Sequence, residues 1–274
     1  MQIVDNLSNC CSINNEIEAI DKLKLLDTDK IIYEVIRIIN GVPLFLEEHY
    51  LRLQQSFALE GVKLSLELHE LKEGIKRLIV VEQRENCNVK VAVTLKNEVQ
   101  TLIIYLSKFH YPSSEEYSKG VTLSLMQLER ETPNVKKLNF NYNEIILKKI
   151  NENKVFEILL ANRDNKMLEG SKSNVFFVQG QSVVTAPNEY ILEGITRRYV
   201  VKICKDLGIN LIQECVSVDA LRNIDGVFIT GTSIKILPAA QIDSYSFLSS
   251  TNPIIAAIQK KYETMIEEYI ARNI

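Results

Sequence analysis

The sequence contains few of the residue types that mark the commonest catalytic sites. It has 274 residues, no tryptophan and only three histidines, His49, His69 and His110. The histidines form neither an HExxH motif nor any other two-histidine spacing, so the sequence predicts no metal site. The ten glycines are dispersed and form neither a P-loop nor a GxGxxG pattern. There is no GxSxG either, so nucleotide-binding and serine-hydrolase signatures are absent.

Charge, apolar runs and cysteines restrict the setting of the protein. The formal net charge is −3, which favours neither nucleic acid nor an anionic membrane surface as a partner. No apolar run approaches the roughly 20 residues that span a bilayer, and the first residues do not resemble a signal peptide. The five cysteines are scattered and odd in number, which is typical of a reducing cytoplasm.

The first half of the chain predicts an α+β domain. An Asn40-Gly41 pair between apolar runs indicates a hairpin. Apolar residues at helical spacing predict helices over 46–61 and 66–85, and His49 and His69 on them are interpreted as solvated helix surface. Two β-rich runs, 88–97 and 100–109, are expected to pair, whereas the first 30 residues are weakly patterned.

A polar stretch divides the chain into two predicted domains. The segment 113–120 is rich in serine and charge and is predicted to be a linker. It separates a smaller N-terminal α+β domain, 1–112, from a larger C-terminal α/β domain, 121–274. Helices are predicted in the second domain at 138–151, 196–207 and 253–272.

Four short segments of this second domain suit a small charged ligand. Glu169 lies in a polar turn, and one hairpin later Gly194-Ile195-Thr196 begins a predicted helix. A lone carboxylate suits a cationic ring nitrogen, and a helix N-terminus suits a phosphate. Two adjacent lysines, Lys136 and Lys137, precede another predicted helix, and a Schiff-base lysine needs a site that favours its neutral form. The loop 230–233 has N–H groups suited to an oxyanion.

The order and spacing of these segments resemble the fold type IV pyridoxal-phosphate enzymes, the class IV aminotransferase family. That family carries an active lysine in a KxLN-like run, then an EGxxSN turn, then LxGITR, then a threonine loop followed by proline. Lys136 and Glu169 are separated by 33 residues, as the family leads one to expect, and the match covers most of residues 31–245. The matching segments are KKLN at 136–139, EGSKSNVF at 169–176, LEGITR at 192–197, GTSIKILP at 231–238 and, resembling EHxxRL, EEHYLRL at 47–53.

The resemblance implies a two-domain fold, similar to D-amino acid aminotransferase, with a β-barrel-like C-terminal domain that binds pyridoxal 5'-phosphate. Lys136 is the expected Schiff-base lysine and proton shuttle, with Lys137 as the alternative if the register shifts by one. Glu169 is expected to face the ring nitrogen and keep the ring an electron sink. The other implied cofactor contacts are Arg52, Ile195, Thr196 and Thr232 at the phosphate, Leu192 on the ring face, and close backbone approach at Gly194 and Gly231.

The substrate side departs from the family pattern. Relatives often carry arginines on the strand predicted at 88–97, where they help to bind a substrate carboxylate. This chain has lysines there, among them Lys90, and no arginine, and lysine lacks the bidentate fork of arginine. Tyr33 matches a residue that lines the substrate side, and a buried strand aromatic is the equal alternative. Lys235 also stands where many relatives have an acidic residue.

Three functional interpretations follow from the resemblance. The first is an aminotransferase that moves an amino group between an amino acid, of branched-chain or D-amino acid type, and a 2-keto acid. The second is a 4-amino-4-deoxychorismate lyase that releases pyruvate with the same cofactor residues. The third is a non-catalytic descendant, motivated by the altered 88–97 strand. The implied partners are small amino and keto acids, and the implied assembly is a cytoplasmic homodimer.

Overall fold

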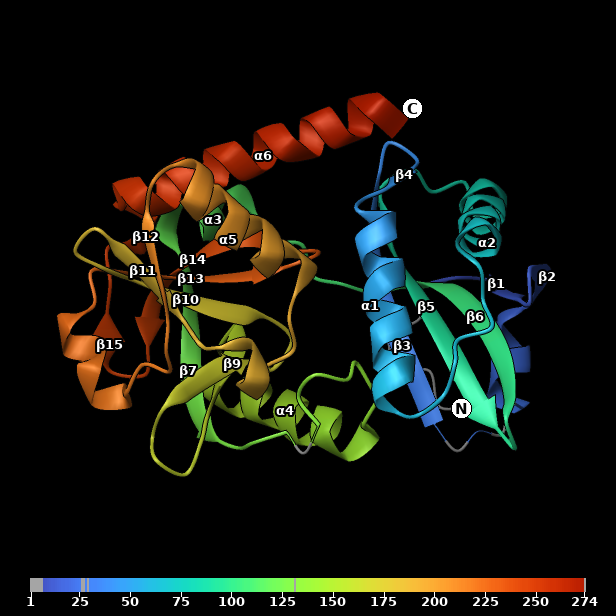
Figure 1. The fold of residues 1–274 in the computed structure, drawn as a ribbon, viewed down its shortest axis with the longest axis horizontal. Coiled ribbons are helices and arrows are strands. Elements are labelled where there is room, and N and C mark those ends of the chain that lie inside the picture. The colour runs from blue at the N-terminus through green and yellow to red at the C-terminus, as the bar shows by residue number, and fades with distance from the viewer. Residues whose placement is uncertain (1–6, 26–27, 29, 131, 274) are drawn as a thin grey trace. The chain divides into compact units, whose positions relative to one another are not determined.

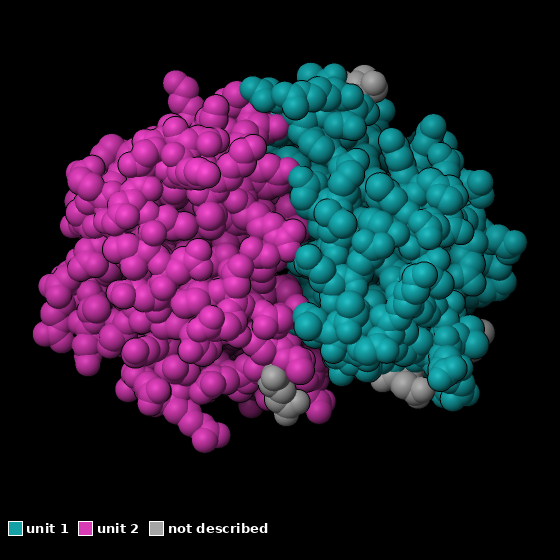
Figure 2. Space-filling model, viewed as in Figure 1, with its two compact units in different colours: residues 1–110, 135–138, 266–274 teal, residues 111–134, 139–265 magenta. Residues whose placement is uncertain are grey.

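The computed structural model describes residues 7–25, 28, 30–130 and 132–273. The chain divides into two compact units, coloured separately in Figure 2. Residues 135–138 belong to unit 1 although the chain on both sides of them belongs to unit 2, and they carry Lys136. Unit 1 comprises Met1–His110, Val135–Leu138 and Ile266–Ile274, and unit 2 comprises Tyr111–Asn134 and Asn139–Met265.

Unit 1 is built on a six-stranded antiparallel sheet with the strand order β2-β1-β6-β5-β3-β4. The β3–β4 hairpin turns at Asn40 and Gly41, which have φ angles of 51° and 76°, as the Asn-Gly signal predicts. β5 and β6 pair as predicted. The strands are β1 (Cys10–Ile13), β2 (Glu16–Ala19), β3 (Lys30–Ile39), β4 (Val42–Pro43), β5 (Cys87–Lys96) and β6 (Val99–Ser107).

Two helices, α1 (Leu46–Leu59) and α2 (Leu68–Val81), cover one face of this sheet (Figure 1). Their apolar sides form a buried core with alternate residues of β3 and β5, including Ile36 and Val91. Successive strand side chains point to opposite faces. Glu34 therefore shares the helical face with Ile36, whereas Tyr33 packs on the other face with a second buried cluster.

Regular structure also occurs where the sequence pattern is weak. Residues 10–19 form the β1–β2 hairpin, followed by a 3-10 helix, η1 (Ile20–Leu25). The segment 113–120, predicted to be a linker, contains helix α3 (Ser114–Lys119). A capping box between Ser113 and Glu116 satisfies the N–H groups at the start of this helix. Strands of four residues and a helix of six are too short for a clear periodic signal.

Unit 2 contains a nine-stranded mixed sheet, in the order β12-β11-β10-β13-β14-β7-β8-β9, with β15 paired to β14. Only residues 171–173 separate β9, at one end of this order, from β10, near the other. The two ends must therefore lie close together, and the sheet curls as the predicted barrel-like form requires. The strands are β7 (Val121–Gln127), β8 (Glu157–Ala161), β9 (Met167–Gly170), β10 (Asn174–Gln179), β11 (Ser182–Thr185), β12 (Asn210–Gln213), β13 (Gly226–Gly231), β14 (Lys235–Ile242) and β15 (Tyr245–Ser246).

The three helices predicted in the second half of the chain are present, each within two residues of its expected bounds. α4 (Phe140–Asn153) begins after Asn139, whose side chain accepts from the Tyr142 N–H at 3.0 Å. α5 (Ile195–Asp206) follows Gly194, and α6 (Pro253–Asn273), red in Figure 1, ends the described chain. Three 3-10 helices connect other elements: η2 (Asn188–Tyr190), η3 (Val218–Asn223) and η4 (Ser249–Thr251).

Candidate functional site

Lys136 lies on a short segment that extends the sheet of unit 1. The Tyr33 N–H donates to the Lys136 carbonyl at 3.0 Å, and an antiparallel bridge joins Ile32 to Lys137. Lys137 is exposed and pairs with Glu60 at 3.8 Å, whereas Lys136 is half-buried. The backbone of β3 thus fixes the Lys136 position, and the two adjacent lysines differ in environment.

Two lysines share one tyrosine ring in unit 1. The Lys136 Nζ lies 5.1 Å from the centre of the Tyr33 ring, and the Lys90 Nζ lies 4.9 Å from the same centre. Lys90 is buried and also lies 5.9 Å from the centre of the Tyr105 ring. Aromatic faces attract ammonium groups, so Tyr33 gathers the two amino groups. An ammonium group at Lys90 suits a ligand that carries a carboxylate.

A buried carboxylate network lies on the helical face of the same sheet. Glu34 accepts from Arg52 Nε at 2.8 Å and Nη2 at 2.5 Å, and from His49 Nδ1 at 2.7 Å. The interpretation of His49 as solvated helix surface is wrong, since only 1% of this residue is exposed. The acidic residues next to His49 in sequence are not its partners. Its partner is Glu34 on β3, and a helical pattern cannot reveal a contact with a strand. His69 is exposed, as predicted.

Acid should weaken the native state through Glu34. Burial by itself raises the pKa of this carboxyl, but Arg52 and His49 outweigh burial and lower the pKa from 4.5 to about 2. Between these values the unfolded chain binds more protons than the native chain. The contribution of Glu34 to the stability of the native state is therefore present above pH 4.5 and is lost as the pH falls toward about 2. We expect the free energy of unfolding in urea to fall by about 3 kcal/mol across this window.

A Glu34→Gln variant tests the source of this pH dependence. The variant should be less stable than the wild type at pH 7, because Arg52 loses its charged partner in a buried site. Its stability should then change less between pH 4.5 and 2. Glu115→Gln removes a carboxylate from an exposed pair with Lys119 and should retain the wild-type pH dependence. The same dependence in Glu34→Gln would contradict this assignment.

In unit 2, Glu169 is a buried carboxylate surrounded by donors. Its Oε1 accepts from Arg130 Nη1 at 3.1 Å. Its Oε2 accepts from the Leu192 N–H at 3.1 Å and from Asn174 Nδ2 at 3.4 Å. Only 3% of Glu169 is exposed, and a buried charge needs such partners. Arg130 was not predicted from the sequence, because its pairing with Glu169 spans 39 residues and belongs to no local motif.

Asn174 connects this carboxylate to the start of α5. Its Nδ2 also donates to the Leu192 carbonyl at 2.9 Å, and its Oδ1 accepts from the Gly194 N–H at 3.2 Å. A Cβ at position 194 would collide with that Oδ1, so this close approach requires glycine. Within the described chain, no side chain caps the first turn of α5, which contains Ile195 and Thr196. N–H groups of this kind are suited to binding an anion.

The turn between β13 and β14 belongs to the same region of unit 2. Asn174 pairs with Thr230 in the sheet, so the turn that contains Gly231 and Thr232 begins beside it. The turn closes where Gly231 pairs with Lys235, and Lys235 has a φ of 51°. Because α5 also packs against β13, three of the predicted segments meet here: Glu169, 194–196 and 231–232.

These residues fit the two polar ends of pyridoxal 5'-phosphate. A buried carboxylate complements a protonated ring nitrogen, and the start of α5 offers N–H donors to a phosphate.

A second buried carboxylate, Glu157, holds the turn 171–173 that follows Glu169. Glu157 accepts from Ser171 Oγ at 2.5 Å and from the Lys172 N–H at 3.2 Å. Burial raises the pKa of Glu157. No sequence signal marks Glu157, whereas Asn174 lies within the EGSKSNVF segment at 169–176.

The described residues provide neither a metal-binding cluster nor a membrane-spanning helix. Among those residues, no group of three or more His, Cys, Asp or Glu side chains is placed to hold a metal ion. Nor does that part of the chain contain a helix with the length and apolar character needed to cross a membrane.

Comparison with known proteins identifies the family. Residues 31–242 match the class IV aminotransferase family. The chain is 31% identical over 255 residues to a D-alanine aminotransferase of Bacillus licheniformis, covering 89% of this chain and 90% of that protein. The chain therefore belongs to the class IV aminotransferase family. An aminodeoxychorismate lyase of Bacillus subtilis is 23% identical, with coverages of 87% and 86%.

Solved structures confirm the fold. A branched-chain amino acid aminotransferase of Escherichia coli superposes with a TM-score of 0.83 at 19% identity, covering 94% of this chain and 95% of that chain. A second branched-chain amino acid aminotransferase, from T.th. and solved with pyridoxamine 5'-phosphate, also gives 0.83, at 22% identity and with coverages of 98% and 96%. The predicted family, fold class and pyridoxal-phosphate cofactor are confirmed by these matches.

Proposed function

We propose that this chain is a pyridoxal-phosphate-dependent aminotransferase that moves an amino group between an amino acid and a 2-keto acid. The observation that carries the proposal is the environment of Glu169. A buried carboxylate held by Arg130, Asn174 and a backbone N–H is suited to holding a proton at the ring nitrogen. The identity to D-alanine aminotransferase, 31% against 23% for the lyase, supports amino transfer as the reaction.

The residues of each unit then have defined tasks. The bound cofactor supplies an electron sink for the charge that develops at the substrate Cα. Lys136 would hold the cofactor through its amino group and would move a proton between the substrate Cα and the cofactor C4′. Ile195, Thr196 and Thr232 bind the phosphate through N–H and hydroxyl donors. Arg52 adds a guanidinium to the phosphate contacts, and Leu192 covers one ring face.

The substrate carboxylate is assigned to Lys90 and Tyr33. Lys90 is buried beside two tyrosine rings and shares Tyr33 with Lys136. A single ammonium gives a carboxylate a point charge instead of the two parallel bonds of an arginine. A D-amino acid is the donor that the similarity to D-alanine aminotransferases favours, and L-branched-chain amino acids are the competing class.

Replacing Lys90 with methionine should raise the KM for the amino donor. The change removes a charged hydrogen bond to the carboxylate but keeps much of the side-chain volume, so the expected rise is about tenfold to a hundredfold. Steady-state kinetics with the best amino donor measure it. Cofactor affinity should stay within about twofold of the wild type, because Lys90 is assigned no cofactor contact.

Lys96→Met is the matched control, since Lys96 lies on the same strand and has no assigned role in binding. It should leave KM within about twofold of the wild type. Lys90→Arg keeps the charge and should recover part of the affinity. A KM in Lys90→Met equal to that of the wild type would remove Lys90 from the substrate site.

A panel of amino donors separates the three functional interpretations. The purified protein, with added pyridoxal phosphate, is supplied with 2-oxoglutarate and with D-alanine, D-glutamate, L-leucine or L-valine, and the new keto acid is measured. We expect turnover with at least one D-amino acid. Pyruvate from 4-amino-4-deoxychorismate, without turnover of any amino acid, would establish the lyase. No product from either assay would favour the non-catalytic descendant.

We also propose that the protein works as a cytoplasmic homodimer. Its family and the family's fold support the assembly, and the five cysteines, none of which is in a disulfide in the described structure, support a reducing compartment. Light scattering of the purified protein should give twice the chain mass of 31.3 kDa. A mass equal to one chain at assay concentration would contradict the dimer.

A further inference from the structure

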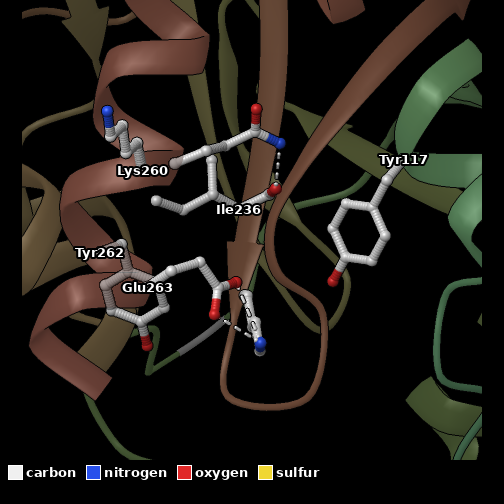
Figure 3. A pocket seen from close by; sticks show the side chains of 7 residues that line it. Tyr117, Ile236, Lys260, Tyr262 and Glu263 are labelled. Atoms are coloured by element: carbon white, nitrogen blue, oxygen red, sulfur yellow. Dashed lines mark hydrogen bonds and ion pairs between the residues drawn. The ribbon is translucent and has the colours of Figure 1, made fainter. Parts of the chain in front are cut away.

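One turn of α6 contacts both segments assigned to the phosphate. The hydroxyl of Tyr262 lies 3.3 Å from Thr196 Oγ1, in the first turn of α5. The next residue, Glu263, pairs with Lys235 at 2.8 Å, where the β13–β14 turn ends. Figure 3 shows Tyr262 and Glu263 side by side on α6. Neither residue belongs to a motif that the sequence singled out.

These contacts border a pocket of about 260 Å³ formed by residues of α3, β14 and α6 (Figure 3). Gln259 Nε2 donates to the Ile236 carbonyl at 3.0 Å on this border. Tyr117, from α3, also lines the pocket and donates its hydroxyl to the Ile234 carbonyl at 2.9 Å. Three hydrogen-bonded or ion-paired side chains of α6 thus hold the helix to the elements that carry Thr196 and Thr232.

The Tyr262 hydroxyl is protonated and can donate a hydrogen bond. Tyr262 is 2% exposed, and burial raises its pKa above the ordinary value, so the hydroxyl stays protonated at working pH. A phosphate dianion accepts hydrogen bonds and donates none in return. When Thr196 directs its hydroxyl proton to such an anion, its oxygen lone pairs are left to accept from Tyr262.

We propose that Tyr262 is a positioning residue for the cofactor phosphate. Its hydroxyl donates to Thr196 Oγ1, fixes the Thr196 rotamer and leaves the Thr196 hydroxyl proton directed to the phosphate. A chain of two hydroxyl donors that ends on an anion strengthens each bond in it. The inference rests on the proposed function, because it takes Thr196 as a phosphate ligand, and it adds a residue that acts through Thr196.

The test compares two cofactors that differ only in the phosphate. The full chain, freed of cofactor, is titrated with pyridoxal 5'-phosphate and separately with pyridoxal, and binding is followed by visible absorbance. Tyr262→Phe keeps the ring and removes the hydroxyl. It should weaken the binding of pyridoxal 5'-phosphate about fivefold to tenfold, which corresponds to the loss of one hydrogen bond. The affinity for pyridoxal should stay within about twofold of the wild type. In a Thr196→Val background the same change should cause no further loss, because the two hydroxyls act as one unit.

Tyr117→Phe is the matched control, since it removes a hydroxyl from the same pocket but not from Thr196. It should not alter the ratio of the two affinities. Three results would overturn the inference: equal weakening of both cofactors by Tyr262→Phe, the same phosphate-specific loss in Tyr117→Phe, or additive losses in the double variant. Failure of the wild type to bind either cofactor would instead overturn the proposed function, and the inference with it.

Discussion

Replacing Lys136 with alanine is expected to abolish amino transfer and the covalent attachment of the cofactor. The change removes both the amino group that binds the cofactor and the base that moves the Cα proton, so kcat should fall by a factor on the order of 10⁴ or more. Borohydride treatment of the wild type should fix the reduced cofactor to the peptide that contains Lys136. Mass spectrometry of the digested protein then locates the attachment, and the Lys136→Ala protein should carry none.

Lys137→Ala is the control that the chain itself offers. Lys137 is adjacent in sequence, but it is 41% exposed and pairs with Glu60, so its loss should change kcat by no more than about twofold. Attachment at Lys137 instead of Lys136 would shift the assigned register by one residue. Cofactor fixed at neither lysine would contradict the enzyme assignment.

Replacing Glu169 with glutamine should lower kcat/KM by a factor of about 10² to 10³, the size of a lost electrostatic contribution in a preorganised site. The amide keeps the shape of the side chain but not its charge, so it no longer favours a proton on the ring nitrogen. Arg130 also loses its charged partner, and the folded state should lose about 3 kcal/mol for that reason. Activity is measured with saturating cofactor, and stability by urea unfolding.

Glu193→Gln separates the role of Glu169 from the loss of any glutamate–arginine pair. Glu193 pairs with Arg198 at 2.8 Å on the same unit, but it is one-third exposed. Its loss should change stability by less than about 1 kcal/mol and leave activity within about twofold. Full activity in Glu169→Gln would show that the ring nitrogen does not depend on this carboxylate.

The sequence predicted most elements whose period is long enough to be counted. The helical stripes of α1, α2, α4, α5 and α6 extend over 12 to 21 residues, and the Asn40-Gly41 pair marks a two-residue hairpin. The β1–β2 hairpin was not predicted because each strand has only four residues, which is too short for an alternating pattern to be counted. The return of residues 135–138 to unit 1 depends on long-range pairing with β3, which local patterns do not contain.

The local motifs named the residues of the proposed cofactor site, but they did not give the contacts that hold those residues in place. Glu169, 194–196 and 231–232 were predicted from turns and a helix start, and the structure brings them together in unit 2. Arg130 contacts Glu169, and Glu157 contacts Ser171, across long separations in sequence. No local motif therefore reveals these two residues. His49 was misjudged for the same reason. Its two neighbours in sequence are acidic, and the carboxylate that it contacts is 15 residues away.

We propose above all that the protein accepts an amino group on its cofactor from an amino acid. The most direct test is a single half-reaction, in which the protein loaded with pyridoxal 5'-phosphate is mixed with D-alanine and no keto acid acceptor. We expect the visible absorbance of the bound cofactor to disappear and one equivalent of pyruvate to form per active site. The absorbance should return when 2-oxoglutarate is added. Unchanged absorbance with D-alanine and with every other D- and L-amino acid, in a protein that binds the cofactor, would contradict the aminotransferase function.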